Sequence, residues 1–230
     1  MTEAQWLATS DLYLLAQFLR TDHRVNRTKS GRRRMRLFGC ACCRLVWPLF
    51  APDPKCAELI SEAERFADAS SSRQSLARLE AALPSTGGPE LGFRFFEFHA
   101  ARMVANSNVF VAAVAAAQTI ASGIRHRANR SGTSIPSGAS IPIDGQQIAI
   151  LRDIFGNPFS PVVFSPNWHT DTAVTLASQM YESRDFSAMP ILADALQDAG
   201  CNDDRILDHC RGPGPHVRGC WVVDLLLSKE

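Results

Sequence analysis

The sequence has little lysine, no long hydrophobic run and no apolar–polar alternation that lasts more than a few residues. Only Lys29, Lys55 and Lys229 are lysines, so 24 − 3 = 21 of the 24 basic residues are arginines. Together with abundant alanine, glycine and proline, this bias is typical of a GC-rich genome and needs no functional cause. The most apolar run, residues 109–117, is much shorter than the roughly 20 residues of a bilayer-spanning helix. We therefore expect no membrane association.

The N-terminus lacks the features of a signal peptide, because Glu3 and Asp11 stand where positive charge is expected and no small-residue cleavage site follows an apolar stretch. The seven cysteines are an odd number. Without a secretory signal, reduced thiols or metal ligands are expected in place of a disulfide framework. These features predict a cytoplasmic protein.

Length and composition indicate a folded chain of one large or two small domains. Its 230 residues are 46% hydrophobic and 20% charged, which are ordinary globular values. The net charge of +1 predicts no attraction of the whole molecule to nucleic acid or membrane.

Apolar residues recur at helical spacing along most of the chain, which predicts a mostly α fold, an irregular bundle of about eight to nine helices. Asp53-Pro54 is a typical helix start, and Pro48 should kink or end the helix before it. A break is expected near Asn106 in the long alanine-rich stretch. The expected helices span residues 11–20, 33–50, about 54–69, 73–83, 91–124, 144–155, 172–181, 189–199, 203–210 and 220–227.

One segment, near residues 128–142, is rich in glycine, serine and proline and has no apolar period, so it predicts a flexible loop. It would separate an N-terminal helical region, residues 1–127, from a C-terminal helical region, residues 143–230. We expect both to pack as one globular unit.

Charge is unevenly distributed. Residues 20–44 hold nine basic residues and one acid, 9 − 1 = +8, whereas residues 171–230 hold five bases and ten acids, 5 − 10 = −5. Nucleic-acid binding through segment 20–44 is one interpretation, with Arg32, Arg33, Arg34 and Arg36 as candidate anion or partner contacts. Packing of the basic region against the acidic one is the alternative.

Cysteine and histidine are concentrated in two regions. The candidate metal ligands are Cys40, Cys43, Cys201, His209, Cys210, His216 and Cys220. Thiolates and imidazoles are the donors of tetrahedral zinc sites. A second CxxC is missing, however, and buried cysteines commonly act as small hydrophobic residues. Core packing is thus favoured, no cofactor is required, and zinc is the alternative.

The segment RGPGPHVRGCW, residues 211–221, is the most distinctive local sequence. His216, Arg218 and Trp221 could contact an anion or a partner, but a structural corner with Trp221 in the core is favoured. Cys220, His216 and Asp224 are also suitable by type for cysteine nucleophilic catalysis. Phosphate-loop, serine-hydrolase, zinc-protease and dinucleotide motifs are not found, so enzymatic activity is left open and not favoured.

Several blocks resemble an expanded protein family of planctomycete bacteria, especially Gemmata-like species. They read MTEAQWL, RLFGCACCRLVW, LRDIFGNPFSPV, MPILADALQDAGC and ILDHCRGPGPHVRGCWVVDLLLSKE, whereas residues 70–140 match poorly. The resemblance implies no activity or site residues. Members have been grouped with SMI1/KNR4-type or repeat-companion proteins, which implies an interaction module.

The leading hypothesis is a non-catalytic cytoplasmic module that binds another protein. A zinc-stabilised domain, a Cys/His-dependent enzyme and nucleic-acid binding are the alternatives.

Overall fold

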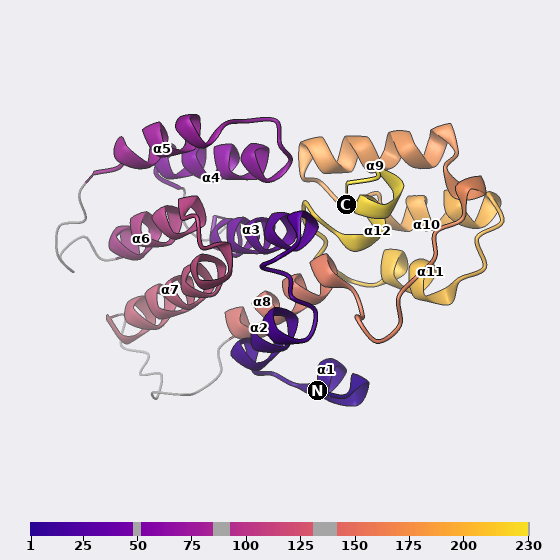
Figure 1. The fold of residues 1–230 in the computed structure, drawn as a ribbon, viewed down its shortest axis with the longest axis horizontal. Helices are drawn as coiled ribbons and strands as arrows, with labels where there is room; N and C mark the ends of the chain where they lie inside the picture. Colours follow the sequence, from indigo (N-terminus) through magenta and orange to yellow (C-terminus); the bar gives the residue numbers. More distant parts are fainter. Residues whose placement is uncertain (48–51, 85–92, 131–141, 230) are drawn as a thin grey trace. The chain divides into compact units, whose positions relative to one another are not determined.

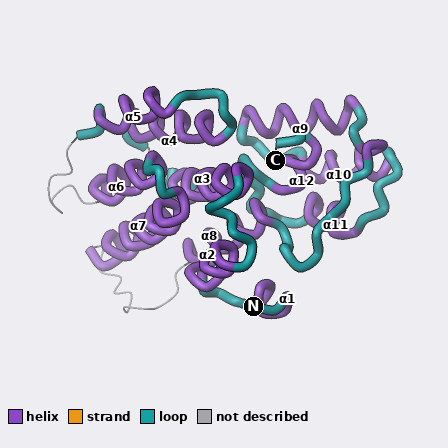
Figure 2. The backbone as a smooth tube through the Cα atoms, viewed as in Figure 1, coloured by secondary structure: helices purple, strands orange, loops and turns teal. Residues whose placement is uncertain are grey.

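The computed structural model describes residues 1–47, 52–84, 93–130 and 142–229, and none of these residues is in a strand. The all-α prediction is confirmed (Figures 1 and 2). The helices are α1 (Glu3–Ala8), α2 (Leu12–Thr21), α3 (Lys29–Arg44), α4 (Pro54–Ala67), α5 (Arg73–Ala81), α6 (Phe93–Ala105), α7 (Val109–Arg130), α8 (Pro142–Phe155), α9 (Asp171–Ser183), α10 (Met189–Asp198), α11 (Asp204–Arg211) and α12 (Trp221–Leu226), with a 3-10 turn η2 (Pro166–Trp168).

The prediction of eight to nine helices was too low, since the described residues form twelve α-helices. The short α1 was not expected. The predicted helix 91–124 is two helices, α6 and α7, because asparagine side chains end one and start the next. Asn106 Oδ1 accepts the Asn108 N–H at 2.9 Å, and Asn108 Oδ1 accepts the Val111 N–H at 3.4 Å. Such local bonds compete with continuous helix.

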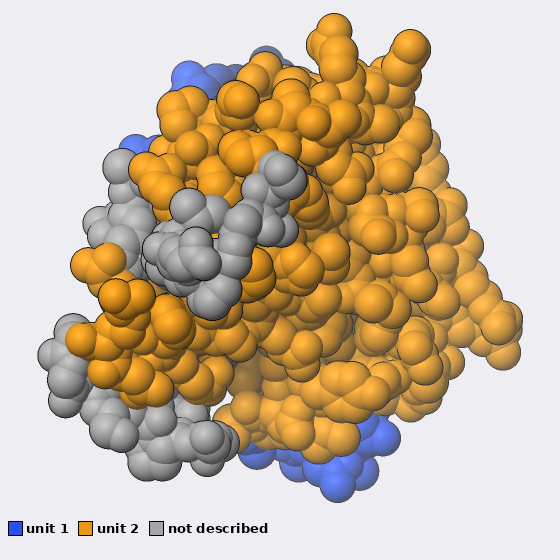
Figure 3. All heavy atoms as spheres, turned by 90° about the vertical axis from the view of Figure 1, so that its left-hand side faces the viewer, with its two compact units in different colours: residues 1–8, 149–230 blue, residues 9–148 orange. Residues whose placement is uncertain are grey.

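The predicted loop near residues 128–142 lies mostly outside the described residues: α7 continues to Arg130 and α8 begins at Pro142. The contacts divide the chain differently from the sequence-based boundary (Figure 3). Unit 1 comprises residues 1–8 and 149–230, and unit 2 comprises residues 9–148, so the boundary falls within α8.

Unit 2 is built around α3, which packs against α4, α6 and α7 (Figure 1). The buried face of α3 contributes Cys40 and Cys43 to a core shared with α4 and α6. Gly39 permits close packing, because a Cβ there would lie 3.1 Å from Val104 Cγ1 and 3.2 Å from Ala113 Cα.

Of the described helices, α7 is long and apolar enough to cross a membrane. However, 56% of its most apolar stretch is buried inside the protein, as in the core helix of a soluble protein.

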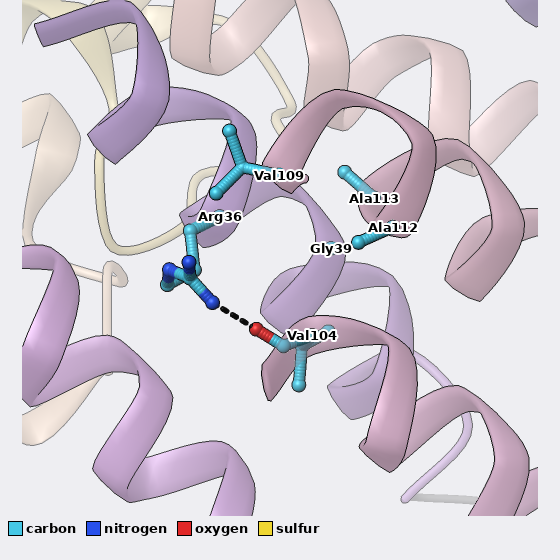
Figure 4. Close-up of a pocket in the computed structure, with 6 residues that line it drawn as sticks. All are labelled: Arg36, Gly39, Val104, Val109, Ala112 and Ala113. Carbon is cyan, nitrogen blue, oxygen red and sulfur yellow. Dashed lines mark hydrogen bonds between the residues drawn. The ribbon is translucent and has the colours of Figure 1, made fainter. Parts of the chain in front are cut away.

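Beside Gly39, the Arg36 guanidinium donates to the carbonyl of Val104 (Figure 4). A second nitrogen of Arg36 donates to the Asn106 carbonyl at 3.1 Å. The gap that Arg36 lines has an empty volume of about 140 Å³ but admits no water-sized molecule. It is a gap between packed helices that is too narrow to hold a ligand.

Unit 1 consists of α9 to α12, the end of α8, and α1. The helix α10 packs against α9 and α11, and α12 packs against α9 and α11. Residues 1–8 belong here because Arg152 of α8 donates to the Trp6 carbonyl at 2.6 Å and Asn157 Nδ2 donates to Glu3 Oε1 at 2.6 Å. The core of the unit includes Tyr181, Leu192 and Cys210, each 0% exposed.

Candidate metal centre

Three segments of unit 1 bring together four side chains, Asp153, His209, His216 and Cys220, hereafter the Asp–His–His–Cys cluster. Each offers one donor atom, and these atoms all lie within 4.8 Å of one another. Asp153 is in the last turn of α8, His209 is in the last turn of α11, and Cys220 is the N-cap residue of α12.

The loop between α11 and α12 positions His216 and Cys220. Gly214 has φ +76°, and a Cβ there would lie 2.8 Å from the backbone nitrogen of His216 and 3.3 Å from Cδ2 of its ring. Gly219, directly before Cys220, has φ +98°. Glycine tolerates this left-handed region without a steric penalty. The glycines of the distinctive segment therefore shape the backbone that presents two of the four donors.

The Asp153 carboxylate is the hub of the cluster. Its Oδ1 lies 2.9 Å from His216 Nδ1 and 3.2 Å from His209 Nε2, and its Oδ2 accepts the Val217 N–H at 3.0 Å. Burial by itself would raise the pKa of the Asp153 carboxyl, but hydrogen bonds from the two histidines outweigh it and the pKa lies below its ordinary value. Asp153 therefore stays negatively charged inside the fold.

Hydrogen bonding alone leaves this cluster incompletely satisfied. His209 Nε2 lies 3.2 Å from Cys220 Sγ and 3.2 Å from Asp153 Oδ1, so one ring nitrogen, with at most one proton, faces two acceptors. His216 Nε2 is buried with no hydrogen-bond partner. A buried polar atom without a partner costs about 1–3 kcal/mol. A cation among these donors would satisfy the contacts that a single proton cannot.

The spacing and the donor types fit zinc. Tetrahedral bonds of about 2.0–2.3 Å place neighbouring ligand atoms about 3.3–3.7 Å apart, near the 3.2 Å that separates His209 Nε2 from Asp153 Oδ1 and from Cys220 Sγ. The 2.9 Å between His216 Nδ1 and Asp153 Oδ1 is a hydrogen-bond distance, so the unpartnered Nε2 is the nitrogen that His216 offers to an ion. One sulfur, two imidazoles and one carboxylate suit Zn²⁺, whereas Mg²⁺ and Ca²⁺ prefer oxygen donors. Cys220 is 0% exposed and the Asp153 side chain is 3% exposed. Four protein donors in a closed site are typical of structural zinc.

The Cys220 thiol is not set up as a free nucleophile. Burial raises its pKa well above the ordinary value, and the charge of Asp153 raises it further, while backbone N–H groups of α12 lower it. Catalysis by a cysteine–histidine–aspartate triad requires the acid on one ring nitrogen of the histidine and the thiol on the other. Here Asp153 and Cys220 approach the same nitrogen of His209. Only bound metal would favour the thiolate.

The remaining predicted ligands lie elsewhere. Cys40 and Cys43 are buried in the core of unit 2. Cys201 and Cys210 are in unit 1, but they pack in its hydrophobic core and are not in the cluster. Burial raises the pKa of the Cys210 thiol to about 12. These four thiols occupy the positions of small apolar residues.

The candidate anion and partner contacts also have definite environments. Arg33 and Arg36 are buried; Arg33 forms an ion pair with Asp68 at 2.9 Å. Arg32 is exposed and Arg34 is half-buried. Arg218 is 9% exposed, and its guanidinium lies 4.3 Å from the centre of the Tyr181 ring.

Trp221 packs against the cluster and against the end of α8. Its ring centroid is 5.1 Å from that of His209. Gly156, with φ +64°, lies beneath it, because a Cβ there would be 3.3 Å from the Trp221 ring. Trp221 thus fills the corner between α8 and α11.

Sequence reasoning missed Asp153. The signal was an acid on the apolar face of a helix, since Ile150 and Ile154, on either side of it along α8, are 0% exposed. An ionised carboxylate at a core position needs a partner. That partner is 56 residues away in His209, 209 − 153 = 56, so spacing motifs could not reveal it.

Comparisons of the chain with protein-family models, with curated proteins and with solved structures found no match.

Proposed function

We propose that this protein is a zinc-binding protein whose unit 1 is held together by one structural Zn²⁺ in the Asp–His–His–Cys cluster. The observation that carries the proposal is the approach of Asp153 Oδ1 and Cys220 Sγ to the same nitrogen, His209 Nε2, at 3.2 Å each. A hydrogen atom can serve one of these contacts, and a metal ion can serve both.

The ion would act as a cross-link. It would join the end of α8, the end of α11 and the start of α12, and Asp153 and Cys220 are 220 − 153 = 67 residues apart. The short helices of eight and six residues, α11 and α12, gain little stability from their own hydrogen bonds. Zinc would therefore supply a large share of the folding free energy of unit 1.

Non-catalytic interaction with another protein, in the cytoplasm, is the role we propose for the folded module. Unit 1 exposes the apolar side chains of Val163 (88%) and Ile191 (58%), which a partner protein could cover. The seven cysteines are all free, which suits a reducing compartment.

The metal content of purified protein tests the zinc proposal. Elemental analysis should find about one equivalent of zinc per chain, and His216→Gln should reduce it to less than about a tenth. His169→Gln is the matched control, since this histidine is in unit 1 but is exposed and outside the cluster. It should keep the full equivalent.

Cobalt substitution gives an independent readout of the ligands. Wild-type protein loaded with Co²⁺ should show a thiolate-to-cobalt charge-transfer band, and Cys220→Ser should abolish it. Wild-type protein that binds neither zinc nor cobalt after reconstitution under reducing conditions would contradict the proposal.

A further inference from the structure

A separate feature of unit 2 is a group of five exposed basic residues that follow one another along the end of α2, the connector (residues 22–28) and the first turn of α3. They are called the cationic surface here and comprise Arg20, Arg24, Arg27, Lys29 and Arg32. Asp22 is the one acid within residues 20–32, so their charge sums to 5 − 1 = +4. Among the residues that the structure describes, no carboxylate pairs with any of the five.

The arginines of α3 differ in their partners according to the face on which they lie. On the buried side, Arg33 pairs with Asp68 at 2.9 Å and Arg44 pairs with Glu64 at 2.5 Å. On the exposed side, Arg32 donates only to backbone carbonyls of the connector, at 3.1 Å for Arg27. The fold thus pairs Arg33 and Arg44 with carboxylates and leaves the charges of the cationic surface without one. Positive charge at a helix N-terminus also opposes the helix dipole, and a bound anion would relieve this.

The backbone that carries these charges is tightly held. Val25 is 6% exposed, and its N–H donates to the Leu19 carbonyl at 3.2 Å. Gly31 packs so closely that a Cβ there would lie 2.1 Å from the Val25 oxygen. Thr28 caps α3 through its side chain, which accepts the Gly31 N–H at 2.9 Å. Because this backbone is already fixed, binding a ligand would cost the ordering of the basic side chains but little backbone entropy.

We propose that the cationic surface binds the phosphate backbone of double-stranded nucleic acid without sequence preference. The side chains suit phosphate, because four of the five are guanidinium groups and the exposed Asn26 and Thr28 add hydrogen-bond donors. The apolar residue of the connector, Val25, is buried, so the connector offers nothing apolar to insert into a bilayer or a protein pocket. It also has no phenylalanine, tyrosine or tryptophan, and its one aromatic ring, that of His23, packs edge-on against Phe18 with 5.0 Å between the ring centroids. The connector therefore lacks a row of free aromatic faces on which successive unpaired bases could stack, which favours a duplex over a single strand.

The affinity of wild-type protein for a 20-base-pair duplex, measured by fluorescence anisotropy, tests this proposal. About four phosphate contacts predict micromolar affinity at low salt and a roughly hundredfold loss between 50 and 200 mM salt. The double variant Arg24→Gln/Arg27→Gln should bind about tenfold more weakly, with a salt slope lower by about two. The control variant Arg78→Gln/Arg127→Gln removes two exposed charges from α5 and α7 of the same unit and should change affinity less than about twofold.

Three results would overturn the proposal. The first is no duplex binding at 50 mM salt, and the second is an equal loss of affinity in both double variants. The third is binding of phosphatidylserine vesicles or polyglutamate that exceeds duplex binding at the same charge concentration. Because the cationic surface is in unit 2, chelation of zinc distinguishes this proposal from the one above: metal loss should leave the effect of Arg24→Gln/Arg27→Gln unchanged.

Discussion

Replacing Cys220 by serine should destabilise unit 1 in the presence of zinc far more than in its absence. Serine keeps the approximate size of the side chain and removes the thiolate, so the variant isolates the metal bond from packing. In the metal-free protein, the change places a more polar hydroxyl group in a buried site and should lower the free energy of unfolding by about 1–2 kcal/mol.

The metal contribution can be derived from the loop that the ion would close. A cross-link between Asp153 and Cys220 encloses 220 − 153 = 67 residues. The chain-entropy relation for a loop of this length gives about 4 kcal/mol. Mass action gives a similar value, about 4 kcal/mol for free zinc at a thousand times its Kd. The cost of Cys220→Ser should therefore be about 5–6 kcal/mol with zinc and about 1–2 kcal/mol with a chelator.

Tryptophan fluorescence during urea unfolding can follow this unit in the full chain. Three of the four tryptophans, Trp6, Trp168 and Trp221, are in unit 1. Trp221 contacts His209 directly, so its emission should respond to the cluster. Each protein is unfolded twice, once with zinc and once with a chelator, and the two free energies are subtracted.

Cys201→Ser is the matched control, because Cys201 is 3% exposed in the same unit and is outside the cluster. The loss in the free energy of unfolding caused by Cys201→Ser should be the same with zinc and with a chelator. The reasoning is refuted if the zinc-dependent part of the Cys220→Ser cost is below about 1 kcal/mol, or if the control shows a zinc-dependent part of equal size.

Three further outcomes are expected. Gly214→Ala should displace His216, because the added Cβ would lie 2.8 Å from the backbone nitrogen of His216. Zinc affinity, measured by competition with a chromophoric chelator, should fall about tenfold or more. Gly39→Val should lower unit 2 stability by about 1–3 kcal/mol, detected by circular dichroism, because α3 then clashes with Ala113. Burial by itself would raise the pKa of Glu62, but hydrogen bonds from Ser71, Ser75 and Arg65 outweigh it and lower the pKa from 4.5 to about 2. The stability that Glu62 contributes is thus complete above about pH 4.5 and lost as pH falls towards 2, up to about 3 kcal/mol, and Glu62→Gln should remove this dependence in urea unfolding.

Much of the helical structure follows from short-range features of the sequence. Asp53-Pro54 starts α4 as expected, since the Asp53 side chain accepts the Lys55 N–H at 3.0 Å and proline takes the first helical position. The break near Asn106 is confirmed, since α6 ends at Ala105 and α7 begins at Val109. It could be predicted because the hydrogen bonds of asparagine side chains reach only a few residues along the chain. The count of helices was wrong where the signal was weak, in the six-residue α1. That helix is fixed by a bond from Arg152, a partner far along the chain.

The cysteines show the limit of arguments from composition. Seven thiols at suggestive spacings look alike in the sequence, yet Cys40, Cys43, Cys201 and Cys210 point into hydrophobic cores. Cys220 belongs to the same core as Cys201 and Cys210, but its sulfur also lies 3.2 Å from His209 Nε2. Which face of a helix or loop is buried depends on the neighbours that cover it, and local spacing does not contain that information.

By itself, the sequence determined an α-helical chain, its main caps and breaks, and the glycine-rich turn that carries His216. Periodicity, capping and backbone freedom are properties of neighbouring residues, so they can be read locally. Only the tertiary structure brought Asp153 to His209 and His216, and only it separated the paired arginines of α3 from the exposed ones. Both depend on contacts between residues far apart in the chain, where burial makes an unpaired charge costly and so selects its partner.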